Sequence, residues 1–171
     1  MPKIIALLFV IISFLIHAQE SSKTEGSDLI EINRSQYKEI KEIDSLIEFA
    51  RTLKGTPYVW GGHTEKGLDC TGFVHYCFAR FEIQTPYSSK RFASYGREIN
   101  LKEAMVGDIM VFRGTNPSDK RPGHVGIISE ITPEKLIFIH SSSSKKHFGV
   151  VETSYYESGY PKRFLKVVRA I

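Results

Sequence analysis

The sequence predicts an α+β domain in which helices come first and an antiparallel sheet follows. Up to about residue 96, apolar residues recur at helical spacing. After Gly107 come short segments rich in β-branched and aromatic residues, which are typical of strands. Helices followed by strands, instead of alternating with them, favour a small antiparallel sheet with helices packed on it. The 171 residues, 42% of them apolar, suit one domain with a real core.

The first 18 residues predict a secretory signal peptide. Lys3 precedes an apolar run from Ile4 to Ile16 that only Ser13 interrupts, and Ala18 suits the position before cleavage. The run is shorter than the roughly 20 residues of a membrane span. We therefore expect a secreted, periplasmic or cell-wall-associated protein with no stable membrane span after processing. An uncleaved membrane anchor is the alternative.

Residues 19–33 are polar and predict a flexible leader, so the folded domain is expected over 34–171. A helix is predicted over about 34–54, ended by Gly55 and Pro57. Asn33 with Gln36 resembles a capping pair at its start. Its apolar stripe consists of Ile40, Ile43, Ile47, Ala50 and Leu53.

Further helices are predicted over about 70–81 and, from a weaker pattern, over 88–96. A short extended piece is expected at 58–62. The strands are expected at 108–113, 124–130, 135–140, 150–153 and 163–169.

The charge of the chain excludes few partners. The formal net charge is +4, and the basic residues are scattered. A mild positive field suits an anionic polymer such as a cell wall, although ordinary solvated lysines explain it equally well. No basic stripe interleaved with aromatic residues indicates nucleic acid. We expect a monomer that binds no nucleic acid.

The two cysteines, Cys70 and Cys77, are not expected to form a disulfide. Seven residues along a helix separate their Cα atoms by about 10 Å, whereas a disulfide needs less than about 7 Å. Cys77 is explained as a small buried hydrophobe. Cys70 opens the helix after the capping residue Asp69, where the helix dipole favours a thiolate. Position alone fits an inert buried cysteine equally well.

Two histidines favour the catalytic interpretation. His124 opens one predicted strand and His140 closes the next. If Glu130 pairs with Glu134 across a tight hairpin, His124 lies directly opposite His140, about 5 Å away on the same face. That face also carries Gly126, Ile128, Leu136 and Phe138, and we expect it to pack on a helix. A register shifted by one residue would place the histidines on opposite faces.

Cysteine, histidine and histidine form a set suited to nucleophilic catalysis. We predict Cys70 as nucleophile, His124 as its base, and His140 as the group that orients the base. A zinc site is the alternative, but one cysteine and two histidines without a CxxC pair match it poorly. No metal or cofactor is therefore expected. His63, His75 and His147 are predicted to lie on the surface or in loops, and His17 falls within the predicted signal peptide.

Around these residues the sequence resembles the NlpC-type cysteine peptidases of bacterial cell walls. The resemblance covers about Leu46 to Arg169. It rests on five blocks in order: Pro57–Gly62 (PYVWGG), Gly67–Val74 (GLDCTGFV), Gly107–Phe112 (GDIMVF), His124–Ile127 (HVGI) and Phe138–Ser141 (FIHS).

The resemblance implies a papain-like fold and the roles given above for Cys70, His124 and His140. It also implies that Tyr58 lies near the thiolate and polarises the reacting carbonyl, with a core aromatic as the alternative. Asp69 matches a position that binds the free amine of the stem peptide, beside its capping role. Ser89 falls in a segment that resembles a substrate-lining stretch. The chain departs from the family pattern at Thr71, Val106 and Tyr87, where Ser, Pro and Arg are usual.

The function implied is a cysteine endopeptidase that hydrolyses peptidoglycan stem peptides at the γ-D-glutamyl–diamino acid bond. An N-acetylmuramoyl-L-alanine amidase or an acyl transferase would use the same Cys-His-His set. An inactive wall-binding module is the third alternative.

Overall fold

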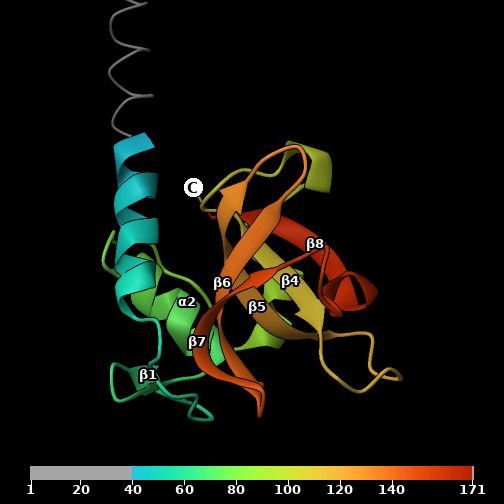
Figure 1. Cartoon of the computed structure of the whole chain (residues 1–171), viewed down its shortest axis with the longest axis horizontal. Coiled ribbons are helices and arrows are strands. Elements are labelled where there is room, and N and C mark those ends of the chain that lie inside the picture. The colour runs from blue at the N-terminus through green and yellow to red at the C-terminus, as the bar shows by residue number, and fades with distance from the viewer. Residues whose placement is uncertain (1–39, 171) are drawn as a thin grey trace, which may run out of the picture. The chain divides into compact units, whose positions relative to one another are not determined.

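Two helices lie against one face of a six-stranded antiparallel sheet (Figure 1). The computed structural model describes residues 40–170, and the residues from Glu42 onward form one compact unit. The predicted signal peptide over 1–18, the leader over 19–33 and the Asn33–Gln36 cap lie outside the described residues. The predicted α+β architecture is confirmed.

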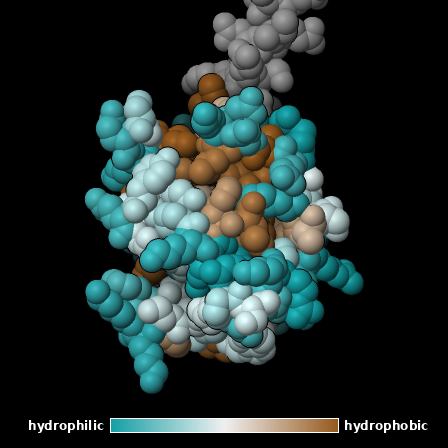
Figure 2. Space-filling model, turned by 90° about the vertical axis from the view of Figure 1, so that its right-hand side faces the viewer, coloured by the Kyte–Doolittle hydropathy of each residue, from teal (hydrophilic) through white to brown (hydrophobic). Residues whose placement is uncertain are grey.

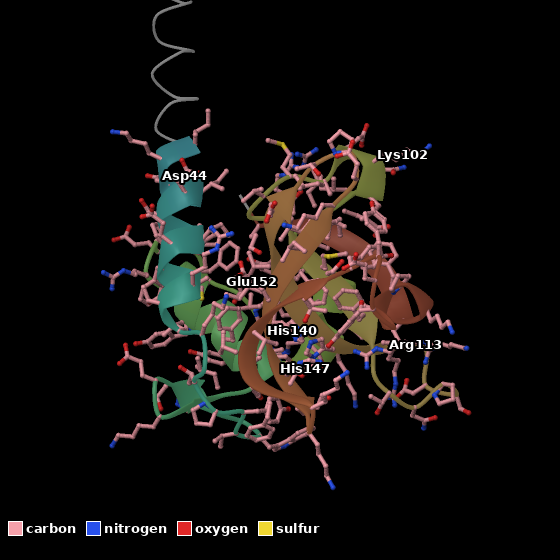
Figure 3. All side chains as sticks on the ribbon, in the orientation of Figure 1. Asp44, Lys102, Arg113, His140, His147 and Glu152 are labelled. Carbon is pink, nitrogen blue, oxygen red and sulfur yellow. The ribbon has the colours of Figure 1, made fainter. Side chains whose placement is uncertain are left out.

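The first helix covers residues 40–52 of the described chain. Leu46, Ile47, Ala50 and Leu53 are buried, whereas Ile40 is 56% exposed, so its predicted place in the apolar stripe was wrong. The end of this helix is tied to the sheet by Glu152, which receives Arg51 and Lys54 at 2.9 Å each (Figure 3). Both cations are about half exposed, so these pairs orient the helix more than they stabilise it.

The second helix, α2, spans Cys70–Ala79 and begins where the sequence predicts. It ends two residues earlier than predicted, because Glu82 adopts a left-handed conformation with φ of 61° and the chain turns away. The third predicted helix, over 88–96, is a 3-10 helix, η1, at Ser89–Ala93.

The sheet has the strand order β3-β8-β4-β5-β6-β7. All five predicted strands are present. Three further strands, β1, β2 and β3, were not predicted. The strands are β1 (His63–Thr64), β2 (Gly67–Leu68), β3 (Arg97–Ile99), β4 (Ile109–Arg113), β5 (Pro122–Ile131), β6 (Leu136–Ser144), β7 (His147–Ser154) and β8 (Phe164–Arg169), with β1 and β2 forming a separate hairpin. Two more 3-10 helices, η2 (Leu101–Glu103) and η3 (Tyr160–Arg163), lie between strands.

The two faces of the sheet carry separate cores. On the helix-covered face, Val125, Ile127 and Ile139 pack with Phe73 and Val74 of α2. On the other face, Phe112 and Phe138 pack with Tyr155 and Tyr160 from the segment before β8. Figure 2 shows one side of the domain, where hydrophobic residues gather in a recess that hydrophilic residues surround.

The predicted register of the β5–β6 hairpin was wrong. Glu130 pairs with Ile137 and Ile127 with Ile139, with a bulge between Ile128 and Glu130. The cause is the turn, which closes between Thr132 and Lys135 through two mutual backbone hydrogen bonds and is therefore tighter than expected. Gly126, not His124, lies across from His140, since a Cβ added at Gly126 would come within 2.9 Å of the His140 Cβ.

Candidate active site

Cys70 is the first residue of α2, and Asp69 caps the helix as predicted. The Asp69 carboxylate accepts hydrogen bonds from the Gly72 N–H at 2.7 Å and the Thr71 hydroxyl at 2.9 Å, and its second oxygen accepts from the Gly61 N–H at 3.0 Å. This cap joins the PYVWGG loop to the start of the helix. Cys70 and Cys77 are both buried free thiols, so the prediction that they form no disulfide is confirmed.

Cys70 lies near the point where two strands separate. The pairing of β5 with β6 ends at Ile127 and Ile139. Beyond this point the Val125 backbone N–H lies close enough to the Cys70 sulfur to lower the pKa of the thiol. Val125 directly follows His124, so the thiol lies at the peptide that carries the predicted base.

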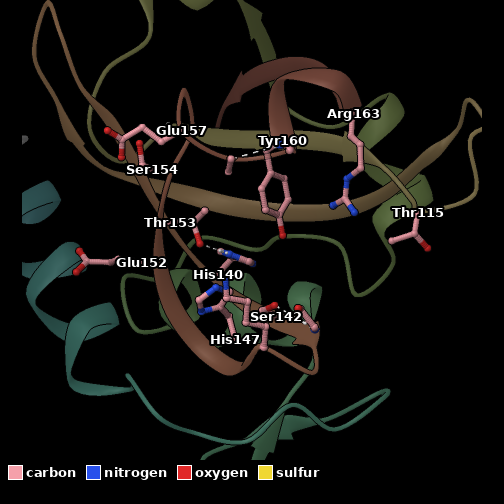
Figure 4. Close-up of a pocket in the computed structure, with 14 residues that line it drawn as sticks. Thr115, His140, Ser142, His147, Glu152, Thr153, Ser154, Glu157, Tyr160 and Arg163 are labelled. Atoms are coloured by element: carbon pink, nitrogen blue, oxygen red, sulfur yellow. Dashed lines mark hydrogen bonds between the residues drawn. The ribbon is translucent and has the colours of Figure 1, made fainter.

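The two histidines contact each other through their ring nitrogens. His124 Nε2 lies 2.8 Å from His140 Nδ1. His140 Nε2 in turn lies 3.0 Å from the Thr153 Oγ1, a contact that Figure 4 shows. One arrangement of protons satisfies both contacts and leaves a lone pair on His124 Nδ1. In it, His124 donates from Nε2 to His140, and His140 donates from Nε2 to the Thr153 oxygen. His124 is then in the tautomer that a base for a thiol requires.

The predicted proximity of His124 and His140 is therefore confirmed, but its geometric basis was wrong. The rings meet diagonally, with centroids 4.9 Å apart, instead of across a directly opposed pair. The face that they share is also not the helix-covered one. It carries Phe112, Phe138 and Tyr160, whose rings lie within about 6 Å of the two imidazoles.

Burial controls the ionisation of the three groups. Burial raises the pKa of the Cys70 thiol to about 11, and the Asp69 carboxylate acts in the same direction, against the backbone N–H groups near the sulfur. Burial and the positive charge of Arg163 lower the pKa of His124 to about 3. The pKa of His140 is likewise held well below its usual range by burial. These shifts favour a neutral Cys70 thiol and a neutral His124 imidazole near pH 7, although the helix dipole alone favours a thiolate.

Tyr58 lies close enough to Cys70 and Asp69 to feel their charges. Burial, followed by these two neighbours, raises its pKa to about 12, so its hydroxyl remains a hydrogen-bond donor. The ring of Tyr58 packs edge-on against Phe148 with centroids 6.1 Å apart. The position agrees with the predicted one, and its role stays a prediction.

Ser89 and Thr71 attach the 85–89 segment to the site. The Ser89 hydroxyl lies 3.5 Å from the carbonyl of Pro122, two residues before His124. The Thr71 hydroxyl, next to Cys70, lies 3.1 Å from the carbonyl of Tyr87. The predicted contact of Ser89 with substrate remains a prediction.

Of the other described histidines, only His147 comes near the site, where it lines a pocket together with His140. His63 and His147 are exposed. His75 lies beside the Thr85 carbonyl, with its Nδ1 2.9 Å from that oxygen. Between residues 40 and 170, no group of three or more His, Cys, Asp or Glu side chains is arranged to hold a metal ion. Over the same stretch, no helix combines the length and apolarity that crossing a membrane requires.

Three residues of the site were missed from the sequence. Thr153 ends the hydrogen-bond chain, Tyr160 places its hydroxyl 3.4 Å from His124 Nε2, and Ser141 donates to the Leu68 carbonyl at 2.6 Å. The Ser141 bond joins the strand of His140 to the segment just before Cys70. Its position directly after His140 was a usable signal, whereas Thr153 and Tyr160 come close only through folding.

A helix-start cysteine and two strand histidines on an antiparallel sheet define a papain-like α+β domain. Residues 55–169 match the NlpC/P60 family. The chain is 35% identical over 131 residues to the probable endopeptidase NlpC of Escherichia coli, which covers 76% of this chain and 79% of that protein. The chain belongs to the NlpC/P60 family.

One further relative and one solved structure are also similar to this chain. Over 98 residues the chain is 35% identical to the bifunctional muramidase/DL-endopeptidase CwlT of Bacillus subtilis, covering 53% of this chain and 30% of that one. The crystal structure of an NlpC/P60 family protein from Bacillus cereus superposes with a TM-score of 0.65 at 24% identity, over 75% of this chain and 40% of that one. The chain thus spans less than half the length of that structure, which shows the fold alone.

Proposed function

We propose that this protein is an extracytoplasmic cysteine endopeptidase that hydrolyses the γ-D-glutamyl–diamino acid bond of peptidoglycan stem peptides. The observation that carries the proposal is the chain of contacts from His124 through His140 to Thr153, with Cys70 close to the Val125 N–H that directly follows His124. Family membership supports the peptidase class, and relatives named as endopeptidases support a peptidoglycan substrate. The DL-endopeptidase name of one relative supports a bond that joins a D-residue to an L-centre.

The proposed chemistry begins with a neutral pair. As the Cys70 sulfur attacks the carbonyl, His124 Nδ1 accepts the thiol proton, and the chain through His140 to Thr153 stabilises the imidazolium. The Cys70 backbone N–H and the Tyr58 hydroxyl donate to the developing oxyanion. His124 then returns the proton to the leaving amine, and water releases the acyl group.

The fragments released on digestion show which bond the protein cleaves, and so test the proposal. Purified protein is incubated with intact stem peptides, and the fragments are identified by mass spectrometry. We expect a new amino terminus on the diamino acid and a free γ-carboxyl group on D-glutamate. Release of the whole peptide from the sugar would identify an amidase, and transfer of the acyl group to an added amine would identify a transferase. Either result contradicts the proposed bond.

Cys70→Ala is the inactive control, and Cys77→Ala is its match on the same helix. We expect only the first to abolish product formation. If the Cys70→Ala protein releases fragments as fast as the wild type, the mechanism is wrong.

A further inference from the structure

A polar pocket of about 660 Å³ adjoins the histidine side of the site. Its lining includes His140 and Thr153, together with Tyr160 and Arg163 of η3 (Figure 4). Most of the other lining side chains are hydroxyls or carry a charge. His140 belongs to this lining, whereas Cys70 and His124 do not.

Arg163 is the residue of this pocket whose positive charge acts on both site histidines. Its guanidinium lies over the Tyr160 ring, with Cζ 4.5 Å from the centroid. The Tyr160 hydroxyl in turn lies 3.4 Å from His124 Nε2. In Figure 4, Arg163 and Tyr160 lie side by side and point the same way, toward the region of His140. One aromatic ring therefore separates the guanidinium from the predicted base.

Arg163 has hydrogen-bonding capacity to spare within the described chain. Its Nε is buried and has no hydrogen-bond partner, and no acidic side chain between residues 40 and 170 forms an ion pair with it. A buried donor without a partner is costly, more so on a charged group. A guanidinium presents a planar fork of N–H groups that matches a carboxylate.

The acidic residues of the pocket do not supply that carboxylate. Glu152 is bound by Arg51 and Lys54 of the first helix and the turn after it. Glu157 is exposed to solvent. Lys146 and His147, which also line the pocket, are exposed as well. Among the described residues, the pocket therefore presents a partly buried cation that lacks an anion.

The proposed mechanism indicates which half of the substrate would occupy the pocket. His124 has to protonate the leaving amine, so the leaving half of the peptide begins at His124 and extends away from Cys70. Tyr160, which lines the pocket, packs on the sheet face away from α2, whereas Asp69 caps α2 and the Tyr87 carbonyl contacts Thr71 of that helix. The leaving half is therefore the part that reaches Arg163.

We propose that Arg163 binds a free carboxylate on the leaving half of the stem peptide, which consists of the diamino acid and any residues attached beyond it. This inference rests on the proposed function, which supplies the peptide substrate. Binding also assists the chemistry. The charge of Arg163 opposes protonation of His124, and a bound carboxylate offsets that charge.

The test uses two synthetic stem peptides that differ in one group. One carries a free carboxylate at the far end of the diamino acid, and the other carries the matching carboxamide. Each is titrated by calorimetry into the Cys70→Ala protein, so the result does not depend on which bond is cleaved. Hydrogen bonds between a guanidinium and a carboxylate change binding affinity by roughly tenfold to hundredfold. We expect the acid to bind tighter than the amide by that factor.

The variants are Arg163→Gln, Arg163→Lys and, as a matched control, Arg97→Gln on the exposed edge strand β3, each made in the Cys70→Ala background. Arg163→Gln should remove the preference by weakening binding of the acid alone. Arg163→Lys should keep part of it, and Arg97→Gln should keep all of it. Thermal unfolding checks that each variant is folded. If the Arg163→Gln variant does not fold, the Arg163→Lys variant still tests whether the preference for the acid depends on this side chain.

Equal binding of the two peptides by the protein with Arg163 intact overturns the inference. So does an Arg163→Gln variant that weakens both peptides equally, because that result assigns Arg163 to support of Tyr160. Failure of the proposed function would be seen separately, in the fragments released by the active protein. Cleavage of the expected bond without dependence on Arg163 therefore removes only this inference.

Discussion

The two ends of helix α2 hold the same residue type in different surroundings. Cys70 and Cys77 are both buried, and burial raises the pKa of both thiols. At Cys77 burial is the whole cause, because apolar groups surround the sulfur. At Cys70 the backbone N–H groups of Val125, Thr71 and Cys70 itself lower the pKa against the effect of burial. Val125 directly follows His124 in β5. A buried thiol becomes a candidate nucleophile through its donors and its base, not through exposure.

Replacing each cysteine by alanine should separate the two roles most strongly. Cys70→Ala removes the nucleophile, so we expect peptidase activity to fall by at least about a thousandfold with little change in stability. Cys77→Ala leaves a small cavity in the core, so we expect activity to remain and the free energy of unfolding to fall by about 1 kcal/mol. Product assays and thermal unfolding measure the pair. Loss of activity in the Cys77 variant alone would reverse the comparison.

A smaller effect should come from Thr153, which belongs only to the Cys70 end. Thr153→Val removes the oxygen that accepts from His140 Nε2 and leaves a buried N–H unpaired. We expect kcat to fall about fivefold to tenfold, with KM nearly unchanged, because substrate does not need this hydroxyl. Thr153→Ser keeps the hydroxyl and should restore the rate. An equal loss in both variants would show that shape, not the hydrogen bond, matters at this position.

The buried histidines beside the Cys70 end of α2 should also make the stability of the domain sensitive to acid. An unfolded histidine takes up a proton below about pH 6.5, whereas His124 in the folded protein stays neutral until about pH 3. Stability is therefore complete above pH 6.5 and falls as the pH drops toward 3. The slope is about 1.4 kcal/mol per pH unit for each such histidine.

Urea unfolding at several pH values between 7 and 4 measures this slope. His140→Asn, which keeps an acceptor at the position of Nδ1, removes one of the two titrating groups and should make the slope shallower. An unchanged slope in that variant would assign the acid sensitivity to the carboxylates of the protein. Cys77→Ala, which changes no titration in this range, is the matched control.

The sequence predicted the elements that local patterns encode. Helix α2 begins at Cys70 as expected because Asp69 can cap it, and the strands from β4 to β8 follow from runs of β-branched and aromatic residues. It did not predict β1, β2 and β3, which have only two or three residues each and show no periodicity. The predicted register of β5 and β6 was also wrong, because the turn closes between Thr132 and Lys135 and a bulge between Ile128 and Glu130 shifts the pairing by one more residue.

By itself, then, the sequence determined the helix-start thiol, the two strand histidines and the fold class, since capping, periodicity and motif order are properties of neighbouring residues. Only the tertiary structure decided that the histidines lie on the face opposite the helices, and that Cys70 lies near the Val125 backbone where β5 and β6 separate. It also decided that Thr153, Tyr160 and Arg163 complete their surroundings. These contacts join residues far apart in the chain, and long-range packing sets them without leaving a local pattern.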